Sequence, residues 1–135
     1  MRRVIAGCVV VLCFAAVGPA SAEAKKFASK VAIEDLYCNA FSETPKRGLP
    51  VCTQSTFVGH VGSAHAKCKR NRKVKFFKQD ELLGTDRTSF GGFSGVRVDA
   101  SEVDASPYHA RVTRRVLRNG DVCKAATSEN FFIPS

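Results

Sequence analysis

The stretch C-K-R-N-R-K-V-K-F-F-K, from Cys68 to Lys78, decides the fold because it joins a cysteine, a block of cations and an alternating apolar pattern. Successive side chains of a β-strand point to opposite faces. An extended chain therefore places Val74 and Phe76 on one face and Lys73 and Lys75 on the other. The pattern predicts a strand with one face in the core and one charged face.

Other stretches also alternate or are rich in β-branched and aromatic residues, and clusters of Gly, Pro, Asn and Asp separate them. Asn119-Gly120 is the strongest turn signal, because both residues tolerate the positive φ of a type I′ hairpin. No amphipathic helix longer than two turns is indicated. We expect an all-β fold, a single antiparallel β-sandwich of about seven short strands. The strands are expected at Lys30 to Tyr37 (a short helix being the alternative), Thr53 to Ser63, Cys68 to Lys78, a hairpin-like unit at Thr85 to Val98, Tyr108 to Leu117, Val122 to Ser128 and Phe131 to Ile133.

The N-terminus has the features of a secretory signal peptide. Arg2 and Arg3 precede an apolar run from Val4 to Val17, and Ala20 and Ala22 supply the small residues of a cleavage site. The run is shorter than the roughly 20 residues of a transmembrane helix. The expected location is therefore outside the cell or in the cell envelope. The expected division is a signal peptide at 1–22 and one β-sandwich domain at 23–135, in which 23–54 holds an N-terminal arm at Glu23 to Ser29, the first strand and a disulfide loop at Asn39 to Pro50.

Four cysteines lie outside the signal peptide: Cys38, Cys52, Cys68 and Cys123. An even number in an oxidising compartment predicts two disulfides, for which three connectivities are possible. We favour Cys38 with Cys52, which closes a loop containing Pro and Gly, and Cys68 with Cys123, which ties a central strand to a terminal one. No C-x-x-C or H-x-x-x-H pair occurs, so neither a metal site nor a cofactor is expected.

The chain is strongly basic, with 21 Lys and Arg against 12 Asp and Glu and a net charge of +9. The cations gather between Lys67 and Lys78 and between Arg111 and Arg118. Such clusters attract polyanions, for example nucleic acid or an acidic cell-wall polymer. The alternative is a solvated strand face that keeps the protein in solution. The candidate polyanion-binding residues are Lys69, Arg70, Arg72, Lys73, Lys75, Arg111 and Arg114.

Five motifs follow one another along the chain: F-x-G-x-V-x-S at Phe57 to Ser63, C-x-x-x-R-K-V-x-x-F at Cys68 to Phe77, G-T-D-R-T-x-x-G-x-F at Gly84 to Phe93, Y-H-A-R-V at Tyr108 to Val112 and V-C-K-A-A-T-S at Val122 to Ser128. In this order they resemble the motifs of small exported bacterial proteins of largely unassigned function. Those proteins are similar in outline to carboxypeptidase-regulatory-like and transthyretin-like sandwiches. The resemblance implies a sandwich fold and an envelope or extracellular setting, and it brings no catalytic residues.

Residues suited to catalysis are few. His60, His65 and His109 are the only histidines, and a secreted basic protein with several histidines invites comparison with a ribonuclease. No G-x-S-x-G nucleophile motif is present. The acidic loop at Asp99 to Asp104 lacks the ligand spacing of an EF-hand, so a solvated loop is favoured over a calcium site.

Most aromatic residues fall at inward positions, which favours a core over a nucleic-acid platform. Phe77, among lysines, and Phe90, at a turn, are the two that we expect to be exposed. The first functional hypothesis is a secreted, non-enzymatic binding or structural module with a cell-envelope partner. A polyanion-binding protein is the alternative, and a secreted hydrolase built on the three histidines is a distant one.

Overall fold

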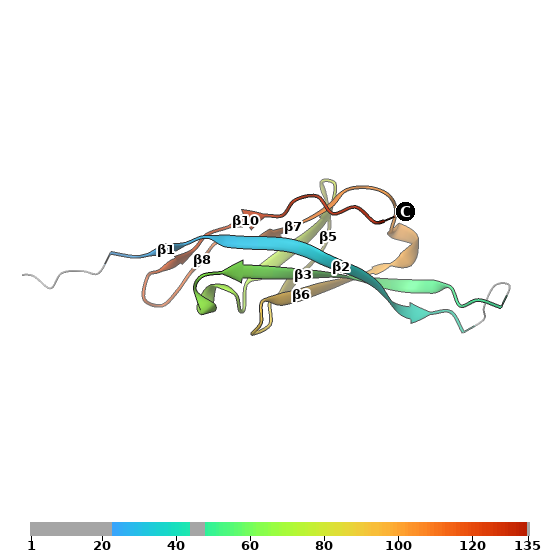
Figure 1. Ribbon diagram of the computed structural model, residues 1–135, viewed down its shortest axis with the longest axis horizontal. Coiled ribbons are helices and arrows are strands. Elements are labelled where there is room, and N and C mark those ends of the chain that lie inside the picture. Colours follow the sequence, from blue (N-terminus) through green and yellow to red (C-terminus); the bar gives the residue numbers. More distant parts are fainter. Residues whose placement is uncertain (1–22, 44–47, 135) are drawn as a thin grey trace, which may run out of the picture.

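The computed structural model describes residues 23–43 and 48–134, and the expected signal peptide at 1–22 lies outside these residues. The described chain contains β-strands and two short 3-10 helices, η1 and η2, and no α-helix, which confirms the all-β prediction (Figure 1). The elements are β1 (Lys26–Phe27), β2 (Ser29–Phe41), β3 (Cys52–Ser63), η1 (Ala66–Cys68), β4 (Lys73–Lys78), β5 (Glu81–Arg87), β6 (Phe93–Asp99), η2 (Ala100–Glu102), β7 (Tyr108–Val112), β8 (Arg115–Val116), β9 (Val122–Cys123) and β10 (Ala126–Thr127).

The strands form three sheets, with the orders β2-β3-β6, β10-β7-β4-β5 and β1-β9-β8. We call them the β2 sheet, the β4 sheet and the β9 sheet. The inward side chains of the β2 and β4 sheets share one core, in which the rings of Phe57 and Tyr108 lie 4.6 Å apart. Val74 and Phe76 are fully buried there, as their alternation predicts. The core consists of Val31, Ile33, Phe57, Val61, Val74, Phe76, Val96, Val98, Tyr108, Ala110 and Val112.

Two glycines allow the β2 and β4 sheets to approach closely. A Cβ atom at Gly59 would lie 2.9 Å from the Phe76 ring, and one at Gly84 would lie 2.7 Å from a methyl group of Val96. Contacts this short are not tolerated, so a larger residue would force the Phe76 ring or the Val96 side chain to move within a closely packed core.

The stretch from Cys68 to Lys78 is a strand only in its second half. Cys68 ends η1, and the chain then turns through Asn71, whose φ is +51°. The turn is fixed to Thr88, because Asn71 N donates to the Thr88 carbonyl and Thr88 N donates to the Arg72 carbonyl, each at 2.9 Å. The prediction of one continuous strand was therefore wrong for residues 68–72.

The prediction of a hairpin-like unit at Thr85 to Val98 was also wrong. β5 pairs with β4, whereas β6 pairs with β3, so the two strands belong to different sheets. The sequence Gly84-Thr85-Asp86 resembles a turn in composition, yet it lies within β5.

The Asn119-Gly120 turn joins β8 to β9, as expected, but it is not of type I′. Only Gly120 has a positive φ, +87°. Its N–H donates to the Leu117 carbonyl at 2.9 Å, and Leu117 N donates to the Asp121 carbonyl at 2.8 Å. This is a type I turn followed by a glycine bulge. The single strand expected at Val122 to Ser128 is divided into two short strands, because β9 pairs with β8 and β10 pairs with β7.

Three expectations at the chain ends need correction. The N-terminal arm is not loose throughout, because β1 pairs in parallel with β9. The first strand is longer than expected, because β2 continues through Cys38 to Phe41 and forms a hairpin with β3 that projects beyond the other strands (Figure 1). The final segment contributes a single bridge, between Phe131 and Tyr108.

Both favoured disulfides are present. Cys38 and Cys52 join the two strands of the β2–β3 hairpin, with their Cα atoms 5.9 Å apart. Cys68 and Cys123 join η1 to β9, with a Cα separation of 5.4 Å. Cys68 and Cys123 are fully buried and form a second core with Leu117, against which Phe27 packs.

The guanidinium of Arg72 lies between these two cores and is only 1 % exposed. It donates to four acceptors that belong to four separate segments of the chain. Burial, and then the positive charge of Arg115, lower the pKa of Arg72. The acceptors are Ser29 Oγ at 3.0 Å, the Cys68 carbonyl at 2.7 Å, the Thr113 carbonyl at 2.7 Å and the Lys124 carbonyl at 3.0 Å.

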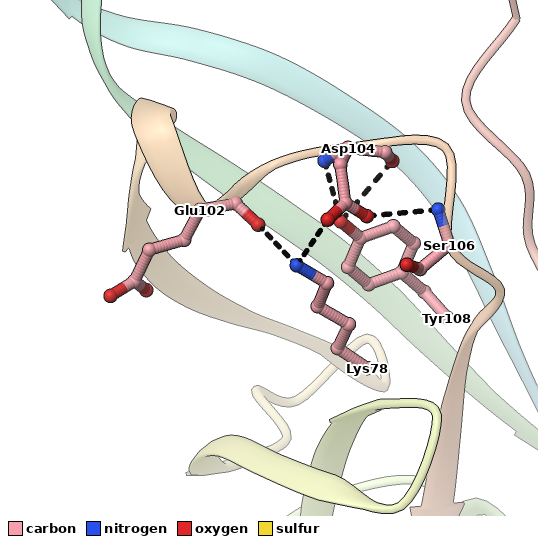
Figure 2. Close-up of polar contacts among 5 residues, drawn as sticks. All are labelled: Lys78, Glu102, Asp104, Ser106 and Tyr108. Atoms are coloured by element: carbon pink, nitrogen blue, oxygen red, sulfur yellow. Dashed lines mark hydrogen bonds and ion pairs between the residues drawn. The ribbon is translucent and has the colours of Figure 1, made fainter.

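The connection from β6 to β7 is fixed by Tyr108 and Lys78 (Figure 2). The Tyr108 hydroxyl accepts from Asp104 N at 3.0 Å and donates to the Asp104 carbonyl at 3.3 Å. Lys78 Nζ lies 2.6 Å from the Asp104 carboxylate and donates to the Glu102 carbonyl at 2.9 Å. The hydrogen bond from Lys78, followed by those from Ser106, holds the pKa of the Asp104 carboxyl well below its ordinary value.

We expect Asp104→Asn to lower the melting temperature at neutral pH. A carboxyl whose pKa is depressed by folding adds stability above its unfolded pKa, about 3.9, and this stability is lost as the pH falls through the folded value. The difference from wild type should therefore shrink in thermal unfolding followed from pH 7 to pH 2. Asp80→Asn, at an exposed turn, is the control, and a constant difference at every pH would contradict the role of the Asp104 charge.

Candidate polyanion interface

The outer face of the β4 sheet carries cations because the alternation that buries Val74 and Phe76 turns Lys73 and Lys75 outward. Lys75 lies directly opposite Arg111 of β7, and Lys73 lies opposite Arg87 of β5. Like charges directly opposite each other destabilise a sheet. This face therefore carries two like-charge pairs, and a contribution to the stability of the fold does not explain why they are present.

The same face also carries an aromatic pair. Phe77 of β4 lies opposite His109 of β7, and their rings are stacked at 4.9 Å with an interplanar angle of 9°. Leu82, opposite Phe77 on β5, is 51 % exposed. Cations and flat apolar surface thus lie together on one sheet face.

A second set of cations lines a groove of about 290 Å³ at the end of the molecule where the β9 sheet lies. Lys67 and Arg70 come from η1 and the turn after it, and Arg115 and Arg118 come from β8 and its turn. The Cys68–Cys123 disulfide brings these segments together, since Cys123 is the strand partner of Arg115.

The two sets of cations meet at the turn around Asn71. Arg115 Nη1 donates to the Arg70 carbonyl at 3.0 Å and to the Asn71 carbonyl at 3.4 Å. Arg87 Nη1 donates to the same Asn71 carbonyl at 3.4 Å. One guanidinium from the groove and one from the sheet face are therefore neighbours. We define the basic band as Lys67, Arg70, Lys73, Lys75, Arg87, Arg111, Arg115 and Arg118.

No carboxylate among the described residues forms an ion pair with the basic band. Among the described residues, Lys78 forms an ion pair with Asp104 at 2.6 Å, and His60 Nδ1 lies 3.7 Å from the Glu34 carboxylate. Cations without a carboxylate partner raise the local positive potential and attract anions.

The predicted site residues lie in four different settings in the structure. Lys73, Lys75 and Arg111 lie on the sheet face and Arg70 lies in the groove. Lys69 is half-buried and Arg114 is exposed, and neither lines the groove. Arg72 was wrong as a binding residue, because its buried guanidinium is turned inward and cannot reach an external ligand.

Arg87 was not among the candidates. Its expected place was the hairpin-like unit at Thr85 to Val98, whereas β5 pairs with β4 and thereby brings Arg87 opposite Lys73. Lys67, Arg115 and Arg118 belong to the two basic clusters of the sequence but were not among the candidates.

The histidines do not converge. His60 lies on the outer face of the β2 sheet, near the Gly91 carbonyl at 3.1 Å, whereas His109 lies on the outer face of the β4 sheet. His65 precedes η1 and accepts from Lys67 N. In residues 23–43 and 48–134, no group of three or more His, Cys, Asp or Glu side chains is arranged to hold a metal ion.

No protein-family model, curated protein or solved structure matches the chain. Within the described residues, no helix has the length and hydrophobicity needed to cross a bilayer. The assignment of function therefore depends on the geometry of the basic band.

We expect Arg111→Glu to stabilise the protein. It converts the like-charge pair with Lys75 into an opposite-charge pair, which is worth about 0.2 to 1 kcal/mol. The melting temperature should rise by about 1 to 5 °C at low salt, and by less at high salt because the charges are screened. Differential scanning calorimetry at two salt concentrations tests this, and a lower melting temperature at low salt would contradict it.

Proposed function

We propose that the chain is an exported, disulfide-bonded, non-enzymatic binding module whose ligand is an extended polyanion held along the basic band. The observation that carries this proposal is the continuity of the band from the groove to the sheet face, with no carboxylate partner among the described residues. The separation of His60 and His109 on opposite outer faces supports binding over hydrolysis.

We also propose that the fold is a sandwich of seven principal strands, β2 to β7 and β10. The orders β2-β3-β6 and β10-β7-β4-β5 correspond to the A-B-E and G-F-C-C′ orders of immunoglobulin-type sandwiches. The bonds from the Tyr108 hydroxyl to the backbone of Asp104 correspond to the tyrosine corner of such domains. The resemblance to carboxypeptidase-regulatory-like and transthyretin-like sandwiches also implies two sheets around one core, and the strand order favours the immunoglobulin type.

Export is supported by the two disulfides, which persist in oxidising compartments. The mature chain should begin near Glu23, because Ala20 and Ala22 satisfy the small-residue rule of signal peptidase. Mass spectrometry of the protein recovered from envelope and medium fractions tests this. A chain that retains Met1 in both fractions would contradict export by this route.

The polyanion proposal predicts that Lys75→Glu/Arg111→Glu elutes from heparin resin at much lower salt than wild type. Folding should be little affected, because one like-charge pair replaces another. The slope of log K against log salt should fall by about 2, one for each phosphate or sulfate contact removed.

The matched control is Lys30→Glu/Arg97→Glu, which makes the same charge change at exposed positions of the β2 sheet. This variant should elute close to wild type. Equal losses in the two variants would show that net charge alone causes retention, and no loss in either would show that the band only solvates the protein.

A further inference from the structure

Phe90 is an aromatic ring exposed beside the basic groove. It lies in the turn between β5 and β6 and is 80 % exposed, as the sequence predicts. One face of the ring covers the Arg70 guanidinium, with 5.3 Å from Cζ of Arg70 to the ring centroid. Such a cation–π contact holds the ring in place and leaves its other face to the solvent.

The turn that carries Phe90 is fixed to the loop that carries Arg70. Thr88 Oγ1 donates to the Lys69 carbonyl at 2.6 Å, which joins the turn to that loop. Within the turn, Ser89 N donates to the Phe93 carbonyl at 2.7 Å. The ring is therefore positioned relative to the cations of the groove. Burial in a core does not explain the presence of an apolar side chain at this position.

A ligand that uses both features must carry anionic groups and flat apolar rings. Polyphosphates carry only the anions, and the sugar rings of sulfated polysaccharides are puckered and bear hydroxyl and sulfate groups, so neither offers a flat aromatic face. A nucleic-acid duplex keeps its bases stacked on one another, whereas a single strand offers phosphates and free base faces together. The stacked pair of Phe77 and His109 follows Lys75 and Arg111 on the sheet face and offers a second aromatic surface at the end of the same band.

We propose that the ligand of the basic band is a single-stranded nucleic acid, with a phosphate in the groove near Arg70 and Arg115 and a base stacked on the free face of Phe90. This inference rests on the proposed polyanion function. Stacking of a base on an aromatic side chain contributes about a tenfold gain in affinity.

The test compares two fluorescent DNA oligonucleotides of equal length, one of mixed sequence and one abasic. The two strands carry the same phosphates, so any difference in affinity must come from the bases. Wild type should bind the mixed-sequence strand about tenfold more tightly than the abasic strand. Phe90→Ala should remove most of this preference and leave heparin elution unchanged. Phe132→Ala is the control, because Phe132 lies in the C-terminal segment and its ring is also exposed, at 59 %. This variant should retain the preference.

The outcomes separate the two proposals. Equal affinity of wild type for the two strands, or a preference that survives Phe90→Ala, would overturn the single-strand assignment while heparin binding still supports the polyanion function. Tighter binding to a duplex of the same sequence would also overturn it. Elution of Lys75→Glu/Arg111→Glu from heparin at much lower salt than wild type, with the preference gone in Phe90→Ala, supports both proposals.

Discussion

The buried guanidinium of Arg72 is the interaction on which the arrangement of the chain depends. A cation removed from water without a carboxylate partner is costly unless other polar groups replace the water. Here three carbonyls and one hydroxyl replace it, and they come from β2, from η1, from the segment after β7 and from the segment after β9. The four hydrogen bonds from Nη1 and Nη2 form together only when all four segments converge, so Arg72 specifies how the β9 sheet joins the rest of the fold.

The same segments carry much of the basic band. Lys67 and Arg70 flank Cys68, whose carbonyl accepts from Arg72, and Arg115 follows Thr113, which supplies another acceptor. Arg115 is close enough for its charge to lower the pKa of Arg72. The structural cation therefore holds the walls of the groove, and the disulfide between Cys68 and Cys123 closes the same region covalently.

Local pattern was sufficient for much of the fold. Alternation correctly predicted the burial of Val74 and Phe76, and a turn position correctly predicted the exposure of Phe90. The right disulfides were favoured because one pair closes a loop containing Pro and Gly and the other ties the middle of the chain to its end. Local pattern could not separate Arg72 from its neighbours, because its burial depends on acceptors up to 52 residues away. It also misassigned β5, because Gly84 and Asp86 give its start the composition of a turn and its end was placed in the hairpin-like unit at Thr85 to Val98.

The site was harder to predict than the fold, because the basic band depends on which residues of neighbouring strands lie opposite each other. The sequence indicated the density of cations, but only the register placed Lys75 opposite Arg111 and Lys73 opposite Arg87. The junction between sheet face and groove depends on the left-handed backbone of Asn71, whose carbonyl accepts from two arginines.

NMR mapping of a bound polyanion tests whether the basic band is the binding surface. Amide shifts of the folded protein would be followed while a heparin oligosaccharide or a single-stranded oligonucleotide is added. If the band binds the polyanion, the shift changes are concentrated there, for example at Arg70, Lys75, Arg111 and Arg115, and the outer face of the β2 sheet around Thr56 and Arg97 is unchanged. Shifts spread evenly over both faces, or centred on the β2–β3 hairpin, would contradict binding at the band.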